Sequence, residues 1–546
     1  MISPEEIDEA EDLIRSNKHI QKLCQEVGVS PDQIACDGWA IGFDPELSFA
    51  SPGRFQQCLM YARPEPDANI YAHPLDFVPV IDTLTKKLLQ SIDNSLKFSG
   101  RDRIKPPWTR YEYLPEFSRP PLRPLHVIQP EGPSFELKGN QLYWQNWKIH
   151  VGFNHREGLV LNTIIFVYSS HFLVYRPMFY RMSLVEMVVP YGAPEAPHHS
   201  KFAFDVGEYG LGNLTNSLSL GCDCLGEIRY LNATNVSHSG KALVIKNAIC
   251  IHEEDAGLLW KHTEVRPGGR SHSVRSRKLV ISFICTIANY EYMFYWNFFQ
   301  DGSINLDTKL SGILNLHLLG PDDPTGPHGV KVAPQIIAQY HTHTFSLRID
   351  PMIDGQKNSI LKTDIVALPN PTGSNENYLG NGFTSEKTVL KTTDEGAQDY
   401  DHHRDRNWTI INPNKLHYST KEPIGYKIVC KDQPKMLVKM DSMVSKRAPF
   451  AKHDLFVTPY VENQFYPAGK LVTGTTSTPE DSIDDWLKGS KKIDNEDIVV
   501  YLTYGVNHLP TPEQFPIMPV EVLTVSLKPS GFFNFNPSLG KFLSST

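Results

Sequence analysis

The chain of 546 residues has little of what several protein classes need. Asp and Glu outnumber Lys and Arg by 61 to 53, so it lacks the basic excess of a generic nucleic-acid-binding protein. Eight cysteines are too few for a disulfide scaffold. The most apolar stretch, residues 158–175, is interrupted by Asn162, Ser169, Ser170 and His171, which predicts two strands and a turn rather than a membrane span. We therefore expect neither nucleic acid nor a membrane among its partners.

Targeting signals are also scarce. The first sixteen residues are acidic and amphipathic, without the basic and apolar segments of a signal peptide. The last residues, "FLSST", differ from a peroxisomal Ser-Lys-Leu address. The expected location is intracellular, either cytoplasmic or peroxisomal.

Composition divides the chain into three parts. Residues 1–115 predict a small α+β domain, with a helical pattern over 3–26, strand-like runs such as "WAIGFD", and a second helix near 82–95. Residues 116–134 are rich in proline and have the composition of a linker. Residues 135–546 are rich in β-branched and aromatic residues and predict a large, mainly β domain. Within it, the polar residues 355–405 predict a long loop or an excursion over the surface.

His341 and His343 lie in the strand-like stretch "QYHTHTFSLRID". Residues i and i+2 of a strand point to the same face, so both imidazoles can bind one ion, and imidazole suits copper or zinc. The alternative is a pair of half-exposed histidines on a sheet face. Spacing cannot select a third ligand from the 21 histidines.

Seven of the ten residues from Tyr290 to Phe299 are aromatic, which by itself predicts a buried core strand. The residues just before and at its start, "TIANYE" (286–291), resemble the signature Thr/Ser-x-x-Asn-Tyr-Asp/Glu of the copper amine oxidases. Five further blocks follow the order of that family: "EMVVPYGAPEAP", "FDVGEYGLGNLTNSLSLGCDCLG", "KNAICIHEEDAGLLWKH", "HTHTFSLRID" and "EDIVVYLTYGVNHLPTPEQFPIMPVE". The chain is thus similar to this family, especially to its intracellular fungal members, from about residue 3 to 540.

The resemblance implies a fold and an active site. It implies a large β-sandwich catalytic domain at 135–546, preceded by one small α+β domain of the type that comes third in the family. It makes Tyr290 the precursor of topaquinone, with Asn289 beside it. It further assigns His341, His343 and His508 as copper ligands, Asp205 as the catalytic base, Tyr191 as a hydrogen-bond partner of the cofactor, and Ala203 and Trp39 as residues of the amine channel.

The resemblance also implies features away from the reaction. Cys224 and Cys250 match the family's disulfide. Asp350 and Asp497, with the carbonyls of Pro351 and Ile498, match a peripheral site for Ca²⁺ or Mn²⁺. Family members are homodimers, so a homodimer is expected.

The implied activity is that of a primary-amine oxidase. Copper and topaquinone would serve to convert a primary amine, water and dioxygen into an aldehyde, ammonia and hydrogen peroxide. One alternative is a catalytically silent copper-binding protein, because most intracellular members carry two small α+β domains and this chain shows one. A second is a zinc hydrolase that uses the same histidines. The sequence does not name the physiological amine.

Overall fold

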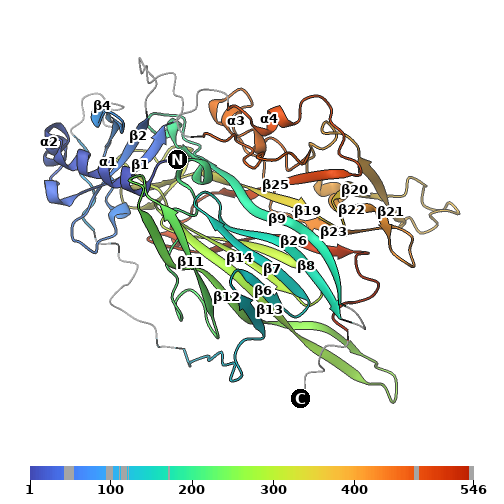
Figure 1. The fold of residues 1–546 in the computed structure, drawn as a ribbon. Helices are drawn as coiled ribbons and strands as arrows, with labels where there is room; N and C mark the ends of the chain where they lie inside the picture. The colour runs from blue at the N-terminus through green and yellow to red at the C-terminus, as the bar shows by residue number, and fades with distance from the viewer. Residues whose placement is uncertain are drawn as a thin grey trace.

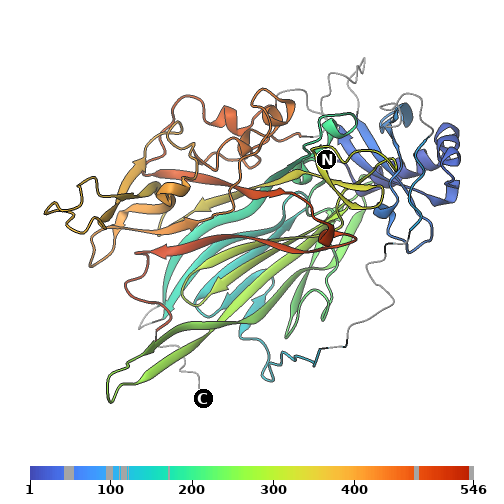
Figure 2. The ribbon, with the colours of Figure 1, turned by 180° about the vertical axis from the view of Figure 1, so that it is seen from behind.

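The computed structural model describes residues 1–41, 54–93, 103–109, 111, 120, 122–169, 173–472 and 479–539. A small α+β unit lies at one end of a large, elongated assembly of β-strands (Figure 1). The view from behind shows the same arrangement, with the N-terminus near the junction of the two parts (Figure 2). The fold is therefore mainly β with a small α+β domain in front, as predicted. Among the described residues, no helix is long and apolar enough to cross a membrane.

The small unit packs two helices on an antiparallel sheet. Ser3 caps the first helix and forms a reciprocal capping box with Glu6, which satisfies backbone N–H groups that the helix itself cannot. The predicted single helix over 3–26 divides at Asn17, whose side chain caps the second helix. The elements are α1 (Pro4–Ser16), α2 (Lys18–Glu26), β1 (Ile34–Ile41), β2 (Phe55–Ala62), β3 (Phe77–Asp82) and β4 (Lys87–Asp93), with the strands in numerical order.

One local prediction was wrong, and one of two alternatives for another segment is excluded. Residues 82–95 hold no helix in their described part: β4 pairs with β3 instead, because cross-strand pairing in the sheet outweighs a weak helical pattern. Residues 355–405 are not simply a loop, since β20 (Lys357–Ala367) and β21 (Phe383–Leu390) form a hairpin there. Their polarity reflects exposure on the surface rather than a lack of strands.

The large domain is a sandwich of two sheets. The first sheet has the order β5-β6-β7-β8-β9-β19-β25-β24, and we call it the histidine sheet. Its strands are β5 (Phe135–Lys138), β6 (Gln141–Trp144), β7 (Trp147–Asn154), β8 (Gly158–Ser169), β9 (Leu173–Pro190), β19 (His341–Pro351), β25 (Glu496–His508) and β24 (Leu455–Pro459). The apolar stretch 158–175 thus forms two strands, as predicted.

The second sheet, which we call the tyrosine sheet, has the order β11-β12-β13-β14-β15-β26-β23-β22-β20-β21. Beyond β20 and β21, its strands are β11 (Arg229–Val236), β12 (Ala242–Thr263), β13 (Ser271–Ile287), β14 (Tyr290–Phe299), β15 (Ile304–Gly312), β26 (Met518–Ser530), β23 (Pro423–Val429) and β22 (Asn407–Leu416).

Burial along the strands explains how the sheets pack. β15 alternates strictly between buried and half-buried positions, so one face points to the core between the sheets. β19 is buried at every position, because one face meets the tyrosine sheet and the other is covered by residues around α3 (Met443–Arg447) and α4 (Ile483–Trp486). The strand that carries His341 and His343 is therefore shielded from water on both sides.

Short elements complete the chain. A small sheet has the order β16-β18-β17, and residues 122–133 hold no helix or strand, in keeping with a linker composition. The remaining elements are β10 (Phe202–Ala203), β16 (Leu316–Leu318), β17 (Gly329–Ala333), β18 (Ile336–Gln339), a π-helical turn (Asp205–Tyr209), and 3₁₀ turns at Pro31–Gln33, Ile70–Ala72, His198–Ser200, His402–Arg404, Pro449–Ala451 and Pro512–Gln514.

Candidate active site

Three buried histidines meet in the histidine sheet. His341 and His343 lie two residues apart on β19, and His508 at the end of β25 is the direct cross-strand partner of His341. One ring nitrogen from each lies within 4.8 Å of the others. The structure thus brings together the three predicted ligands, including the one that spacing alone could not select.

In two of these imidazoles, a hydrogen bond fixes one ring nitrogen as the donor. The lone pair of the other ring nitrogen then points toward the other histidines. Nδ1 of His341 lies 2.8 Å from the Gln339 carbonyl oxygen and must donate to it, so Nε2 is the free acceptor. Nε2 of His508 lies 2.9 Å from Oε1 of Gln514, which leaves Nδ1 as the acceptor. Nε2 of His343 is buried and has no hydrogen-bond partner in the described part of the chain. An orphaned buried nitrogen beside two inward lone pairs fits a metal-binding site.

Electrostatics favour neutral imidazoles at this position. Burial lowers the pKa of His341 and of His343 well below the usual range, and burial also lowers the pKa of His508. A metal ion needs the neutral form, because protonation removes the donor lone pair. Three neutral imidazoles suit copper or zinc.

The hairpin of β13 and β14 places Tyr290 opposite these histidines. Ile287 pairs with Tyr290, so only Ala288 and Asn289 form the turn, and Ala288 has a left-handed φ of 50°. A two-residue turn fixes the register of both strands. Asn289 secures the turn by donating from Nδ2 to the Ile313 carbonyl oxygen at 2.6 Å.

The outer members of the "TIANYE" signature lock this hairpin. Thr286 and Glu291 are cross-strand partners, and the Thr286 hydroxyl lies 2.9 Å from both carboxylate oxygens of Glu291. On the other side of β14, Gly312 pairs with Tyr290 at a φ of 93°, and a Cβ there would lie 2.6 Å from the Asn289 carbonyl oxygen. The signature therefore builds a rigid support for one tyrosine.

The phenol group of Tyr290 reaches the inward nitrogens of two histidines. Its oxygen lies 2.8 Å from Nε2 of His341 and 3.3 Å from Nδ1 of His508. Since Nε2 of His341 is an acceptor, the Tyr290 hydroxyl donates to it. The phenol oxygen of Tyr290 thus adjoins the nitrogen atoms that could hold a metal.

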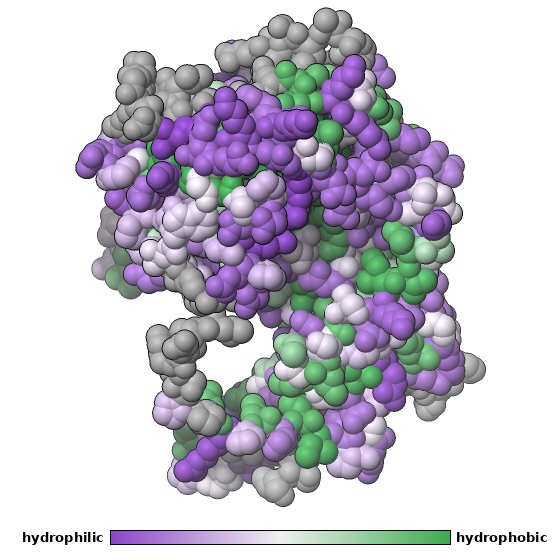
Figure 3. Space-filling model, turned by 90° about the vertical axis from the view of Figure 1, so that its left-hand side faces the viewer, coloured by the Kyte–Doolittle hydropathy of each residue, from purple (hydrophilic) through white to green (hydrophobic). Residues whose placement is uncertain are grey.

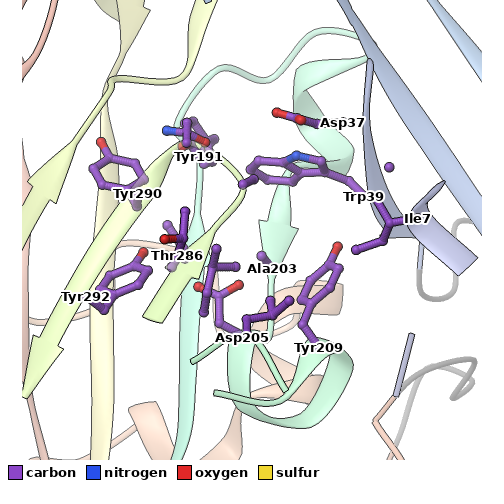
Figure 4. Close-up of a pocket in the computed structure, with 16 residues that line it drawn as sticks. Ile7, Asp37, Trp39, Tyr191, Ala203, Asp205, Tyr209, Thr286, Tyr290 and Tyr292 are labelled. Atoms are coloured by element: carbon purple, nitrogen blue, oxygen red, sulfur yellow. The ribbon is translucent and has the colours of Figure 1, made fainter. Parts of the chain in front are cut away.

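A cavity of about 120 Å³ lies beside Tyr290 (Figure 4). The small domain contributes Trp39 of β1 to its wall, and the sandwich contributes Ala203 and Tyr191. The Tyr191 ring stacks on His341 with centroids 4.6 Å apart and meets the edge of Trp39 at 5.7 Å. The two predicted channel residues do line this cavity.

Asp205 lies at the cavity in the π-helical turn that follows β10, close to Tyr292 in Figure 4. Burial raises the pKa of Asp205 well above its usual range, and the carboxylates of Glu208 and Glu186 raise it further. A carboxyl group with a raised pKa in an enclosed apolar site can exchange protons near neutral pH.

Tyr292 is a site residue that the sequence reasoning missed. Its hydroxyl lies 3.1 Å from Nδ1 of His343, and a hydrogen bond between Tyr292 and Asp205 counters the upward pKa shift of the carboxyl. It therefore connects His343 to Asp205. The strand period could have revealed it, because Tyr290 and Tyr292 share one face of β14.

Lys201 and Gln514 were also missed. The Lys201 ammonium is buried 4.6 Å from the Tyr191 ring and donates to Oε1 of Gln339 at 3.0 Å; burial lowers its pKa to about 7. Gln514 orients His508. No sequence pattern indicates either residue: the hydrogen-bond partners of Lys201 lie more than a hundred residues away along the chain, and Gln514 reaches His508, six residues before it, only through the fold of the loop between them.

The predicted disulfide is not formed in this structure. Cys224 and Cys250 are free thiols that lie together, and a hydrogen bond with Cys250 lowers the pKa of Cys224 to about 7. Tyr230, the cross-strand partner of Cys250, approaches the Cys224 sulfur at 3.5 Å. The two sulfurs are thus neighbours without a covalent bond.

The predicted peripheral ion site is a hollow of about 170 Å³ lined by Asp350, Pro351 and Asp497, among others. Burial raises the pKa of Asp350 to about 6 and also raises the pKa of Asp497. Arg348 donates to Asp350 at 2.9 Å and so competes with a cation for that carboxylate. Ile498 is fully buried next to the hollow.

Fold and site together define a β-sandwich protein whose two sheets enclose a tri-histidine site, a tyrosine and a carboxylate of raised pKa. Comparisons with known proteins agree with this definition. Residues 136–543 match the family model of the copper amine oxidase enzyme domain, and residues 5–101 match that of the copper amine oxidase N3 domain. The chain belongs to the copper amine oxidase family, and it is an oxidoreductase that acts on amines.

Individual relatives cover nearly the whole chain. Copper amine oxidase 1 of Schizosaccharomyces pombe is 44% identical over 97% of this chain and 75% of its own length. The peroxisomal primary amine oxidase of Pichia angusta is 43% identical over 99% of this chain and 78% of its own length. The crystal structure of a copper-containing benzylamine oxidase from Hansenula polymorpha matches with a TM-score of 0.91 at 35% identity, covering 99% of this chain and 84% of that one.

Proposed function

We propose that the chain oxidises primary amines to aldehydes with copper and a topaquinone formed from Tyr290, releasing ammonia and hydrogen peroxide. The observation that carries the proposal is the position of the Tyr290 phenol oxygen, 2.8 Å and 3.3 Å from inward nitrogens of His341 and His508. His341, His343 and His508 would hold copper. When bound, copper supplies redox chemistry with dioxygen, and the quinone supplies an acceptor for two electrons.

The chain's own residues perform the remaining tasks. The cavity between Trp39 and Tyr191 admits an amine and excludes bulk water, because its walls are largely aromatic and apolar. Asp205, at the same cavity, removes the proton from the carbon next to the amine nitrogen. Tyr292 steadies Asp205 by its hydrogen bond, and Tyr191, which stacks on His341, would contact the cofactor. Asn289 holds the turn that presents Tyr290.

Ala203 supports a wide approach for the amine. It lines the cavity with a side chain of one carbon, where a larger group would narrow the passage. The relatives carry names that specify different amines, among them a primary amine oxidase, a benzylamine oxidase, a diamine oxidase and a histamine oxidase. We propose a primary amine as substrate, with an intracellular place of action like that of the peroxisomal relatives.

The hollow at Asp350 and Asp497 is proposed to bind Ca²⁺ or Mn²⁺. Two carboxylates with raised pKa values face one space, and the Pro351 and Ile498 carbonyls would complete an oxygen-rich set. Met352 also lines the hollow and offers no oxygen side chain, so binding should be weak.

A homodimer is proposed from the exposed apolar side chains of the β11–β12 region. The exposed fraction is 72% for Val236 and 59% for Val244, and Leu243, next to Val244 in the chain, is exposed as well. Figure 3 views the side of the molecule that carries the small domain, with hydrophobic patches below a largely hydrophilic upper part. Exposed apolar groups of this kind indicate a surface that another chain covers.

Metal reconstitution tests the proposed function. Protein prepared without copper should be colourless and carry an unmodified Tyr290. Cu²⁺ in air should produce a visible quinone absorption and leave the Tyr290 peptide heavier by two oxygens minus two hydrogens. Zn²⁺ should bind the same ligands without colour, because it has no redox chemistry. An unmodified Tyr290 after copper loading in air would favour a catalytically silent protein, and amine-independent hydrolysis with Zn²⁺ would favour a zinc hydrolase.

A further inference from the structure

The turn that carries Asp205 rests on four buried charged side chains that the proposed reaction does not use. Glu186 of β9 and Glu208 of the turn itself are fully buried. Arg447 of α3 and Arg156 of the β7–β8 connection are also buried, with 1% and 6% of their surface exposed. Burial of four charges is costly, so such a group is kept only when it is paired and serves a purpose.

Each carboxylate holds the backbone on one side of Asp205. Oε2 of Glu208 accepts from the Phe204 amide at 3.0 Å, directly before Asp205. Oε1 of Glu186 accepts from the Gly207 amide at 3.0 Å, two residues after it. The Glu186 side chain lies so close that a Cβ on Gly207 would be 2.6 Å from its Oε2.

Each carboxylate is in turn paired with one arginine. Nη2 of Arg447 lies 2.8 Å from Oε1 of Glu208, and Nη2 of Arg156 lies 3.5 Å from Oε2 of Glu186. The arginines also bind backbone carbonyls of residues 469–472: Arg447 that of Val472 at 3.0 Å, and Arg156 that of Lys470 at 2.7 Å. With all four groups ionised the network is electrically balanced beneath Asp205.

We propose that the Glu208–Arg447 and Glu186–Arg156 pairs are positioning residues for Asp205, which fix its turn and set the pH at which it takes up a proton. The inference rests on the proposed role of Asp205 as the base. When the four charges balance, burial in the apolar cavity is the main influence on the pKa of the Asp205 carboxyl. An unpaired charge at this depth would shift that pKa strongly, because a buried charge is poorly screened.

The electrostatics of the neighbourhood support this assignment. Apart from burial, which is the main cause, Glu208 and then Glu186 raise the pKa of Asp205, while the hydrogen bond with Tyr292 lowers it. Burial raises the pKa of Glu186 to about 7, which Arg156 counters. The other titratable groups that sense Asp205 are Tyr191, Tyr209, Tyr292 and Cys285, all with pKa values raised mainly by burial.

A charge-removal cycle on one pair tests the proposal in the copper-loaded protein. Glu208→Gln keeps the shape and leaves Arg447 unpaired, so the acidic limb of the kcat/KM profile should move to lower pH by about one pH unit. Arg447→Gln leaves Glu208 unpaired and should move the limb to higher pH. The double variant restores the charge balance, and the acidic limb of its kcat/KM profile should return close to the pH of the parent's limb.

The same cycle with Glu186→Gln and Arg156→Gln provides a second, independent test if one pair proves essential for folding. Asp364→Asn is the matched control, because it removes the carboxylate of a bidentate ion pair with Arg406. Asp364 lies on β20, in a part of the tyrosine sheet far from the cavity. It should leave the pH profile unchanged. Changes in rate that are equal at every pH would show a purely structural role and overturn the proposal.

The experiments distinguish a failure of this positioning role from a failure of the proposed role of Asp205 as the base. If Asp205→Asn retains turnover, the role of Asp205 fails. If Asp205→Asn is inactive with an intact quinone band while the glutamate and arginine variants keep the parent profile, only the positioning role fails.

Discussion

Asp205 owes its chemistry to its surroundings rather than to its residue type. An exposed aspartate is ionised at neutral pH and is a weak base, whereas burial raises the pKa of this carboxyl well above the usual range. The reaction needs the ionised form, so turnover should fall as the pH drops below the raised pKa, earlier than for an ordinary carboxylate.

Asp205→Asn should abolish most of the turnover and leave the quinone intact. The amide keeps the size of the side chain but accepts no proton, so the rate should fall by about 10²–10⁴-fold. Steady-state oxygen consumption and the visible absorption of the same sample measure both quantities. A variant with more than about a tenth of the parent rate would remove Asp205 from this role.

Gln514 illustrates how a residue acts through a neighbour. It holds Nε2 of His508 at 2.9 Å and so keeps Nδ1 available for a metal. Gln514→Leu should weaken copper binding by about 10–100-fold without removing a ligand. Competition with a chelator measures the affinity. Gln335→Leu, a residue outside the site, is the control, and equal affinities in the two variants would contradict the assignment.

At the scale of elements, the β13–β14 hairpin determines where Tyr290 points. Thr286 and Glu291 join the two strands on either side of a two-residue turn, and Gly312 of β15 packs directly against the Tyr290 backbone. The hairpin therefore holds Tyr290 in a fixed orientation, which the proposed conversion of this side chain beside a metal would require.

Gly312→Ala should destabilise the protein and slow quinone formation. The left-handed φ of 93° costs about 1 kcal/mol for alanine, and the contact of 2.6 Å with backbone atoms should add about 1–3 kcal/mol. Gly489→Ala is the matched control, with a φ of 90° and no atom within 4 Å of the added carbon. Thermal unfolding and the rate of colour development should separate the two; identical behaviour would refute the steric argument.

The paired thiols of Cys224 and Cys250 link the segment before β11 to β12. A pKa of about 7 makes Cys224 partly ionised at neutral pH and able to react when an oxidant such as hydrogen peroxide is present. We expect oxidation to close a disulfide that stabilises the protein by about 3 kcal/mol. Peptide mapping without reductant should find the pair bridged, and two free thiols after oxidation would contradict this.

At the scale of the molecule, the site exists only where three parts meet. The histidine sheet supplies the three clustered histidines, the tyrosine sheet supplies Tyr290 and Tyr292, and the small domain supplies Trp39. The small domain thus belongs to the substrate cavity as well as to the fold, since its β1 closes one wall (Figure 4).

Charges placed on the apolar face of β11 and β12 should dissociate the proposed homodimer. Val236→Glu together with Val244→Glu introduces two carboxylates where both side chains are exposed, so the folded chain tolerates them while an apolar interface does not. Sedimentation velocity should show a dimer for the parent and a monomer for the variant. Lys246→Glu on the same strand is a control for charge alone; a monomeric parent would disprove the dimer.

The sequence by itself determined the strand-rich nature of the large domain and the shared face of His341 and His343, and its resemblance to a known family pointed to Tyr290 and its proposed partners. These follow from local periodicity and from motifs of a few adjacent residues. Only the tertiary structure decided that His508 lies opposite His341, that Tyr292 joins His343 to Asp205, and that the network of Glu186 and Glu208 lies beneath the base. The reason is physical: these contacts join residues far apart along the chain, and burial, which sets their pKa values, is a property of the packed sheets rather than of any local stretch.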